Sequence, residues 1–249
     1  MVPAKAVAKR PDVPRVLPAD ARAETVQAVD RFLASSRAVR DQVSMLAGAI
    51  GRRVLTTGMG RPRLRDSPIG RVPAAWELRS LGEIACFASG RAKPKDFFRV
   101  RSPSHPVPVF SGKGLLGFCG NALHRGATIV VGRVGIHCGA IHLVFEEECW
   151  ITDAALYVYE TRPEVDLRFL YHSLRRLDLA SLRTTDHQPL ISLSTIYPLL
   201  LALPPLEEQR EICALMSAAE TLRDAQDMVL AHARRVRSAL LAAVMAGPA

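Results

Sequence analysis

Apolar residues recur every three or four positions along two long stretches, one near each end of the chain. The first stretch covers residues 21–57, with apolar side chains at Val26, Val29, Phe32, Val39, Val43, Leu46, Ile50 and Val54 and a polar exception at Ser36. The second covers residues 204–246, with Ile212, Leu215, Ala219, Leu222, Val229, Ala233, Val236 and Leu240 and the polar Gln226 in the same stripe. This period gathers the apolar side chains on one stripe of an α-helix, so the pattern predicts two long helices.

The predicted helices carry start and stop signals. Gly58 follows the first stripe and supplies the left-handed residue that ends many helices. Pro204 and Pro205 precede the second stripe, and Glu207 and Glu208 then place acidic groups in its first turn. Two stripes of similar length predict that the helices pack on each other as an antiparallel, coiled-coil-like pair. Two ordinary core helices are the alternative.

Residues 76–203 follow a different pattern, in which short β-rich runs alternate with Gly, Pro and Asn turns. The clearest strands are "IVVGRV", "AIHLVF" and "AALYVYE", a helix is predicted in "VDLRFLYHSLRRLDL", and "QPLISLSTIYPLLLALP" is predicted to return to strand. Residues 58–75 are predicted to be a linker, and residues 1–20 a disordered basic tail. The fold class is therefore α+β: a mixed α/β domain carried between two long antiparallel helices.

Charge narrows the choice of partner. The chain has 249 residues and a formal net charge of +9, which favours a polyanion. Nucleic acid is the first candidate, and an anionic membrane is weaker because no run approaches the roughly 18 apolar residues that cross a bilayer. The five cysteines show no C-x-x-C spacing, so neither a disulfide framework nor a zinc site is expected. We expect a cytoplasmic protein.

No catalytic motif emerges. "GKGLLG" and "GRVGIHCG" match neither nucleotide phosphate-loop spacing. His137 and Cys138 would point to opposite faces of a strand, so Cys138 is expected to be a buried structural thiol. The carboxylates at 146–148 could hold Mg²⁺, but a solvated loop is favoured. The chain is therefore expected to lack catalysis, a bound metal and a cofactor of its own.

Basic and polar loops are the candidate contacts instead. Residues 89–101 hold five basic residues around two Phe, either as a phosphate-contacting loop or as a solvated turn. Residues 183–192 form a polar loop whose side chains suit base edges or phosphates. The predicted phosphate or base contacts are Arg91, Lys93, Lys113 and Arg133. The predicted contacts of the polar loop are Arg183, Thr184, Thr185, His187 and Gln188.

Six strings in order resemble one known family: "GRPRLRDSPIGRVPAAWELRSLGEI", "PVFSGKGLLGF", "IVVGRVGIHCGAIHLV", "WITDAALYV", "TTDHQPLISLSTI" and "LPPLEEQREI". They resemble the target recognition domain and conserved helices of type I restriction-modification specificity subunits. The resemblance covers about residues 24–245. It implies a non-catalytic subunit that reads one half of a bipartite site in double-stranded DNA. It also implies docking of methyltransferase subunits, which hold S-adenosylmethionine, and a separate restriction subunit that cleaves.

The chain departs from the full-length pattern because it has one recognition domain between two helices. The resemblance therefore implies a half-subunit that forms a homodimer through its helices and reads a palindromic bipartite site. Two other classes stay open: the specificity portion of a methyltransferase or nuclease enzyme, and a helical interaction protein that binds no DNA. A salt titration of duplex binding separates the DNA-binding classes from the last one.

Overall fold

The computed structural model describes residues 19–60, 62–182 and 189–245, and the chain divides into two compact units. One unit joins Met1–Ala47 to Ala219–Ala249, and the other is Gly48–Ala218. The long helices α1 (Ala19–Thr57) and α5 (Leu206–Met245) contribute to both units. They lie where the two apolar stripes predict long helices, while most of the predicted tail, residues 1–18, lies outside the described residues.

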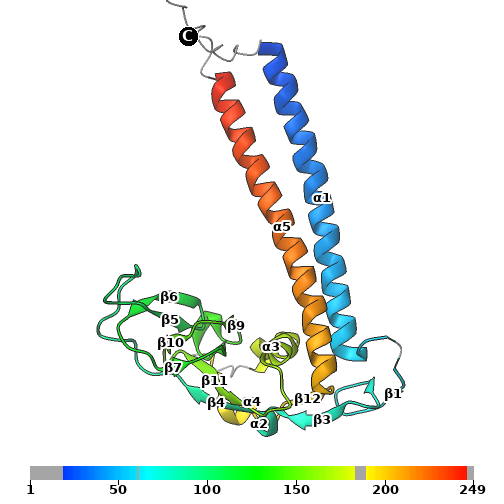
Figure 1. Ribbon diagram of the computed structural model, residues 1–249, viewed down its shortest axis with the longest axis vertical. Coiled ribbons are helices and arrows are strands. Elements are labelled where there is room, and N and C mark those ends of the chain that lie inside the picture. Colours follow the sequence, from blue (N-terminus) through cyan, green and yellow to red (C-terminus); the bar gives the residue numbers. More distant parts are fainter. Residues whose placement is uncertain (1–18, 61, 183–188, 246–249) are drawn as a thin grey trace, which may run out of the picture. The chain divides into compact units, whose positions relative to one another are not determined.

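In the first unit, α1 and α5 lie side by side and run in opposite directions (Figure 1). Leu33, Leu230 and Ala233 are buried where the helices meet. Two ion pairs join the helices beside this contact, one between Arg237 and Asp30 and one between Arg40 Nε and Asp227 Oδ1 at 3.2 Å. The narrow apolar seam and these ion pairs hold the two helices in one register.

The second unit is built on two four-stranded sheets. The first has the order β6-β5-β10-β7, in which β10 runs parallel to β5 and the other pairs are antiparallel. The second has the order β4-β11-β8-β9 and is antiparallel throughout. The strands are β4 (Ala85–Ser89), β5 (Val107–Ser111), β6 (Gly114–Cys119), β7 (His124–Arg125), β8 (Thr128–Gly132), β9 (Ile141–Val144), β10 (Glu148–Ile151) and β11 (Ala155–Thr161).

Burial explains why these runs form strands. All five residues of β8 are buried, and the first four residues of β11 beside it are buried too. Side chains of β8, β9, β10 and β11 share one cluster, so the two sheets adjoin around a common core. The three β-rich runs singled out in the sequence are β8, β9 and β11, which confirms that part of the prediction.

Helices cover the other face of the second sheet. Helix α3 (Leu167–Arg176) begins at Asp166, whose carboxylate accepts hydrogen bonds from the backbone of Arg168 and Phe169. Phe169, Leu170 and Leu174 of α3 are fully or almost fully buried against the sheet core. The helix predicted in this stretch is therefore confirmed. Short elements α2 (Leu81–Ile84), η1 (Gly135–His137) and η2 (Leu179–Leu182) complete this region.

The prediction that residues 188–204 return to strand is wrong for the first part of that stretch. Residues Leu193–Ile196 form the helix α4, and only Leu200–Leu203 form a strand, β12. The hydroxyl of Ser192 accepts a hydrogen bond from the backbone of Thr195, and this N-cap overrides the β-rich composition. In β12 the burial alternates, so one face of the strand is buried and the other is partly exposed.

The segment between α1 and the domain is built into the fold. Strands β1 (Leu64–Arg65) and β2 (Val72–Pro73) pair with each other, and β3 (Glu77–Ser80) pairs with β12. Gly58 has a φ of 70° directly after α1, as expected of a helix stop. The carboxylate of Glu208 accepts hydrogen bonds from Trp76 Nε1 at 2.9 Å and from the Met59 backbone at 3.1 Å. The start of α5 is thereby fastened to the chain that follows α1.

Candidate nucleic-acid interface

Four loops meet at one end of the two sheets. They are Ser89–Arg91 after β4, Gly112–Gly114 between β5 and β6, Gly132–His137 after β8, and Thr152–Ala154 before β11, and we call them together the loop cluster. Three of the predicted contacts, Arg91, Lys113 and Arg133, belong to it. The structure thus brings together basic residues that are far apart in the sequence.

The glycines of the loop cluster allow backbones to meet. A Cβ added to Gly112 would lie 2.7 Å from the Cα of Gly132, and one added to Gly132 would lie 2.0 Å from the carbonyl oxygen of His137. A Cβ on Gly90 would lie 2.1 Å from the Thr152 carbonyl oxygen. The nearest neighbours of these glycines are therefore other loops of the same domain, and this packing requires glycine.

Arg91 and Arg133 are held by the same short turn. The backbone N–H of Arg133 donates to the Ala154 carbonyl at 2.9 Å, and the backbone N–H of Asp153 donates to the Arg91 carbonyl at 2.8 Å. Arg91 also pairs with Thr152 as an isolated parallel bridge. Because both arginines are fixed through their backbones to residues 152–154, their positions depend on the fold and not on side-chain contacts alone.

Lys113 lies at the tip of the β5–β6 hairpin and is exposed. Its backbone N–H donates to Ser111 Oγ at 3.1 Å, and Gly114 follows with a φ of 100°, a left-handed conformation that suits glycine. His142 Nε2 donates to the Gly112 carbonyl at 2.9 Å. The turn that presents Lys113 is therefore braced from β9, a contact that the sequence did not indicate.

Ile136 is the most exposed large apolar residue in the described chain, at 91%. It lies in η1, three residues after Arg133, where Gly135 has a φ of 71° and Cys138 N–H donates back to the Gly135 carbonyl at 3.0 Å. Cys138 is buried as predicted, but it follows a 3₁₀ turn and not a strand. An aliphatic side chain among basic loops suits a nucleic-acid groove, where base edges offer apolar contacts.

The predicted readout residues Arg183, Thr184, Thr185, His187 and Gln188 lie outside the described residues. The described residues on both sides of them contact the stretch that follows Arg133. Gly135 N–H donates to the Pro189 carbonyl at 3.1 Å, and a Cβ on Gly139 would lie 2.6 Å from the Ala180 nitrogen. The described residues Ala180 and Pro189, on the two sides of this segment, therefore lie beside the stretch that follows Arg133.

Lys93 is not part of the loop cluster. Its ammonium lies 3.5 Å from the centroid of the Phe97 ring, a cation–π contact. Phe97 packs against the buried cluster of Val107, Val109 and Cys119, whereas Phe98 is half exposed. Of the two Phe in residues 89–101, one therefore supports the core and the other does not.

Ionisable groups elsewhere in the domain serve the fold. Glu148 of the 146–148 carboxylates lies at the start of β10 and pairs with Arg125 at 2.7 Å, while Glu146 and Glu147 are exposed. Burial raises the pKa of Cys149 and of Cys213 to about 12, so both stay protonated thiols. Within residues 19–60, 62–182 and 189–245 no group of three His, Cys, Asp or Glu side chains could hold a metal ion.

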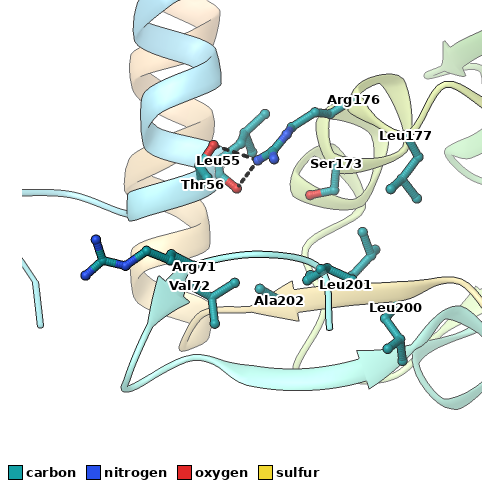
Figure 2. Close-up of a pocket in the computed structure, with 11 residues that line it drawn as sticks. Leu55, Thr56, Arg71, Val72, Ser173, Arg176, Leu177, Leu200, Leu201 and Ala202 are labelled. Atoms are coloured by element: carbon teal, nitrogen blue, oxygen red, sulfur yellow. Dashed lines mark hydrogen bonds between the residues drawn. The ribbon is translucent and has the colours of Figure 1, made fainter. Parts of the chain in front are cut away.

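A separate cavity of about 130 Å³ lies below the end of α1, between that helix, α3 and β12 (Figure 2). Arg176 reaches across it, and its Nη1 donates to the Leu55 carbonyl at 3.0 Å and to Thr56 Oγ1 at 2.7 Å. A cation suits the C-terminal end of a helix, where backbone carbonyls lack partners. The position of Arg176 in this cavity is therefore explained by its contacts with the C-terminal end of α1.

None of the described helices is long and apolar enough to cross a membrane.

The architecture is that of the specificity subunits of type I restriction-modification systems. A crystal structure of the S subunit from M. genitalium is similar with a TM-score of 0.63 and 16% identity, over 90% of this chain and 59% of that one. The HsdS subunit from Thermoanaerobacter tengcongensis is similar with a TM-score of 0.59 and 19% identity, over 92% and 56%. A chain from a study of complex assembly and conformational transition of the type I R-M system is similar with a TM-score of 0.63 and 20% identity, over 91% and 56%.

Comparison of the sequence with known families and proteins supports the same assignment. Residues 73–225 match the model of the type I restriction modification DNA specificity domain, and the chain belongs to this family because the match covers more than half of it. The specificity subunit of the type I restriction enzyme EcoprrI from Escherichia coli is 25% identical over 145 residues, which are 58% of this chain and 36% of that protein. The chain thus spans a little over half the length of the solved S subunits and about a third of the curated relative.

Proposed function

We propose that this chain is the DNA-recognition subunit of a type I restriction-modification enzyme and that the loop cluster lies on the DNA. The observation that carries the proposal is the convergence of Arg91, Lys113 and Arg133 on four loops at one end of the sheets. Phosphate neutralisation by Lys and Arg provides affinity, and side chains that reach base edges provide specificity. The polar residues 183–188, which lie outside the described residues, contribute further base contacts in this proposal.

Salt dependence tests the DNA contact. Each Lys or Arg that neutralises a phosphate adds roughly 0.9 to the slope of log affinity against log salt. Replacing Lys113 by Ala should therefore weaken binding to all duplexes and lower the slope by about one. Glu147→Gln changes the net charge by one unit in the opposite direction on an exposed residue outside the loop cluster. It is the control and should not lower the slope. No measurable duplex binding by the wild-type protein at low salt would contradict the proposal.

We also propose that the chain works as a homodimer, because one recognition domain reads only half of a bipartite site. A half-site of a few base pairs occurs many times in a genome, so a protein that reads it alone would not select one target among the competing sites. The matched part of this chain covers only 56–59% of the solved S subunits, and a second copy would supply the missing part. Two copies related by a two-fold axis would read an inverted repeat.

The helical unit provides a surface for the second copy. A groove of about 680 Å³ runs between α1 and α5 and is lined mainly by apolar side chains. Phe32 is 50% exposed on one side of it, and Met228 and Val229 are 74% and 42% exposed on the other. Monomeric proteins rarely leave such continuous apolar surface in water, and the same surface from a second helix pair would cover it.

Mass measurement at micromolar concentration tests the dimer. The wild-type chain should have twice its monomer mass of 27.2 kDa. Val229→Glu places a charge in the groove and should give a monomer that stays folded, because the residue is exposed. Ser238→Glu on the polar side of α5, next to Arg234 and Arg237, is the matched control and should remain a dimer. A wild-type monomer at every concentration, with or without a methyltransferase subunit, would refute this part of the proposal.

Catalysis belongs to other subunits in this proposal. The chain docks methyltransferase subunits, which bind S-adenosylmethionine and modify the DNA, and a restriction subunit cleaves it. Family membership and the fold shared with S subunits of type I systems support this assignment. The purified chain alone should therefore bind DNA without methylating or cutting it, and addition of a methyltransferase subunit should confer site-specific methylation.

A further inference from the structure

The side chain of Arg133 is held differently from the other basic residues of the loop cluster. Its Nη1 donates to Ser89 Oγ at 3.0 Å, and its Nε is buried without a hydrogen-bond partner among the described residues. Arg91 and Lys113 are exposed, and no side-chain hydrogen bond or ion pair to the described residues holds either of them. Among these three basic residues, Arg133 is thus the one whose charged group is held by a hydrogen bond to the described residues.

The backbone of Arg133 is fixed as well. Its N–H donates to the Ala154 carbonyl, and its own carbonyl accepts from the Ile191 N–H at 2.9 Å and from Cys138 Sγ at 3.2 Å. A free arginine side chain samples many rotamers, and binding would otherwise have to remove that conformational freedom. Anchoring at both ends reduces that loss before any ligand arrives.

The remaining donors define what Arg133 is able to contact. A guanidinium has five N–H groups; one of these is used by Ser89, and the Nε group is buried. The rest belong to the two terminal nitrogens, which form a planar fork. Such a fork matches the O6 and N7 acceptors of guanine in the major groove, which is the commonest specific contact of arginine with a base. A phosphate also accepts from such a fork, but it can equally be contacted by a flexible Lys or Arg side chain.

We propose, on the basis of the DNA-binding function above, that Arg133 reads a guanine and that Ser89 is the positioning residue that orients its guanidinium. Lys113 and Arg91, whose side chains form no hydrogen bond or ion pair with the described residues, contact phosphates. Ser89 is exposed at the end of β4, so its replacement does not disturb the core. It therefore acts on recognition through Arg133 and not on folding.

The test combines protein variants with a modified base. The DNA site is first selected by the wild-type protein from a randomised pool of duplexes. Duplexes carrying this selected site are then prepared with 7-deazaguanine, which lacks the N7 acceptor, at each guanine in turn. For the wild-type protein, one such replacement should weaken binding several-fold, which is less than the about 5- to 100-fold expected for loss of a whole bidentate base contact, because the O6 acceptor remains. Ser89→Ala should weaken binding to the selected site several-fold. It should also reduce the loss of affinity that 7-deazaguanine causes at that same position, which we call the 7-deazaguanine penalty.

Two controls separate the positioning of Arg133 by Ser89 from a general loss of DNA affinity. Ser89→Thr keeps the hydroxyl and should restore both the affinity and the 7-deazaguanine penalty. Lys113→Ala should weaken binding to selected and random duplexes equally and leave the penalty unchanged. Equal losses on both duplexes for Ser89→Ala, or an unchanged penalty, would overturn the role of Ser89 while leaving DNA recognition intact. Failure of the wild-type protein to select any sequence would instead overturn the proposed function itself.

Discussion

The contact between Gly112 and Gly132 makes a specific prediction about Gly132→Ala. The new Cβ would lie 2.0 Å from the His137 carbonyl oxygen, whereas ordinary contacts begin at 3.4 Å, so the backbone must move by about 1.4 Å (3.4 − 2.0). Gly132 also donates to the Ala140 carbonyl at 2.7 Å and accepts from the Gly139 N–H at 2.8 Å. Loss of two hydrogen bonds costs about 2 kcal/mol, and overpacking adds about 1–3 kcal/mol.

The unfolding free energy of Gly132→Ala should therefore fall by about 3 kcal/mol or more in urea. Both tryptophans, Trp76 and Trp150, lie in the Gly48–Ala218 unit, so their fluorescence follows this unit directly. DNA binding should also fall, because the shift moves Arg133 and the turn of Lys113.

Gly126→Ala is the matched control in the same domain. Gly126 has a φ of 90° with nothing within 4 Å of an added Cβ, so the substitution should cost about 1–2 kcal/mol and leave DNA binding unchanged. A Gly132→Ala protein as stable as the wild type, with the same DNA affinity, would refute the reasoning about the loop cluster.

Three further predictions concern the fold. Gln209 is fully buried and hydrogen-bonds to three backbone groups, so Gln209→Ala should destabilise the protein by about 3 kcal/mol in urea, whereas exposed Glu211→Ala should cost less than about 0.5 kcal/mol. Burial lowers the pKa of His124 below 6.5, so the folded protein should lose stability as pH falls from 6.5 towards the folded-state pKa. Thermal melts should show this loss in the wild type, and His124→Phe should remove it. Cys149 and Cys213 should resist a thiol reagent at pH 8 until urea unfolds the protein, and rapid labelling of the native protein would contradict their burial.

The sequence was informative where structure follows from local periodicity. Three kinds of predicted element depend on residues within a few positions of one another. They are the stripes of α1 and α5, the apolar runs of β8 and β11, and the helical pattern of residues 165–179. The error at Leu193–Ile196 had a local cause too. Ser192 followed by Thr195 is a helix-start signal, and the apolar residues around it were read as strand instead.

The loop cluster was predictable only in part. Arg133 and Lys113 stood out because they are basic residues beside glycines, but the sequence gives no sign that Gly112 meets Gly132. Ser89 carries no signal at all, since a serine at the end of a strand is usually solvated. Ile136 could have been noticed as an apolar residue between two glycine turns, although its exposure depends on the 3₁₀ turn that forms there. Such contacts join residues far apart in the chain, and single-sequence patterns do not encode them.

The central claim is that this chain selects DNA by sequence through one recognition domain per copy. The most direct test recovers duplexes bound by the purified protein from a randomised pool, alone and with a methyltransferase subunit, and sequences them. The account predicts enrichment of one short motif in two inverted copies separated by a fixed spacer. A recovered pool with no enriched motif, at salt concentrations where duplexes are bound, would contradict it.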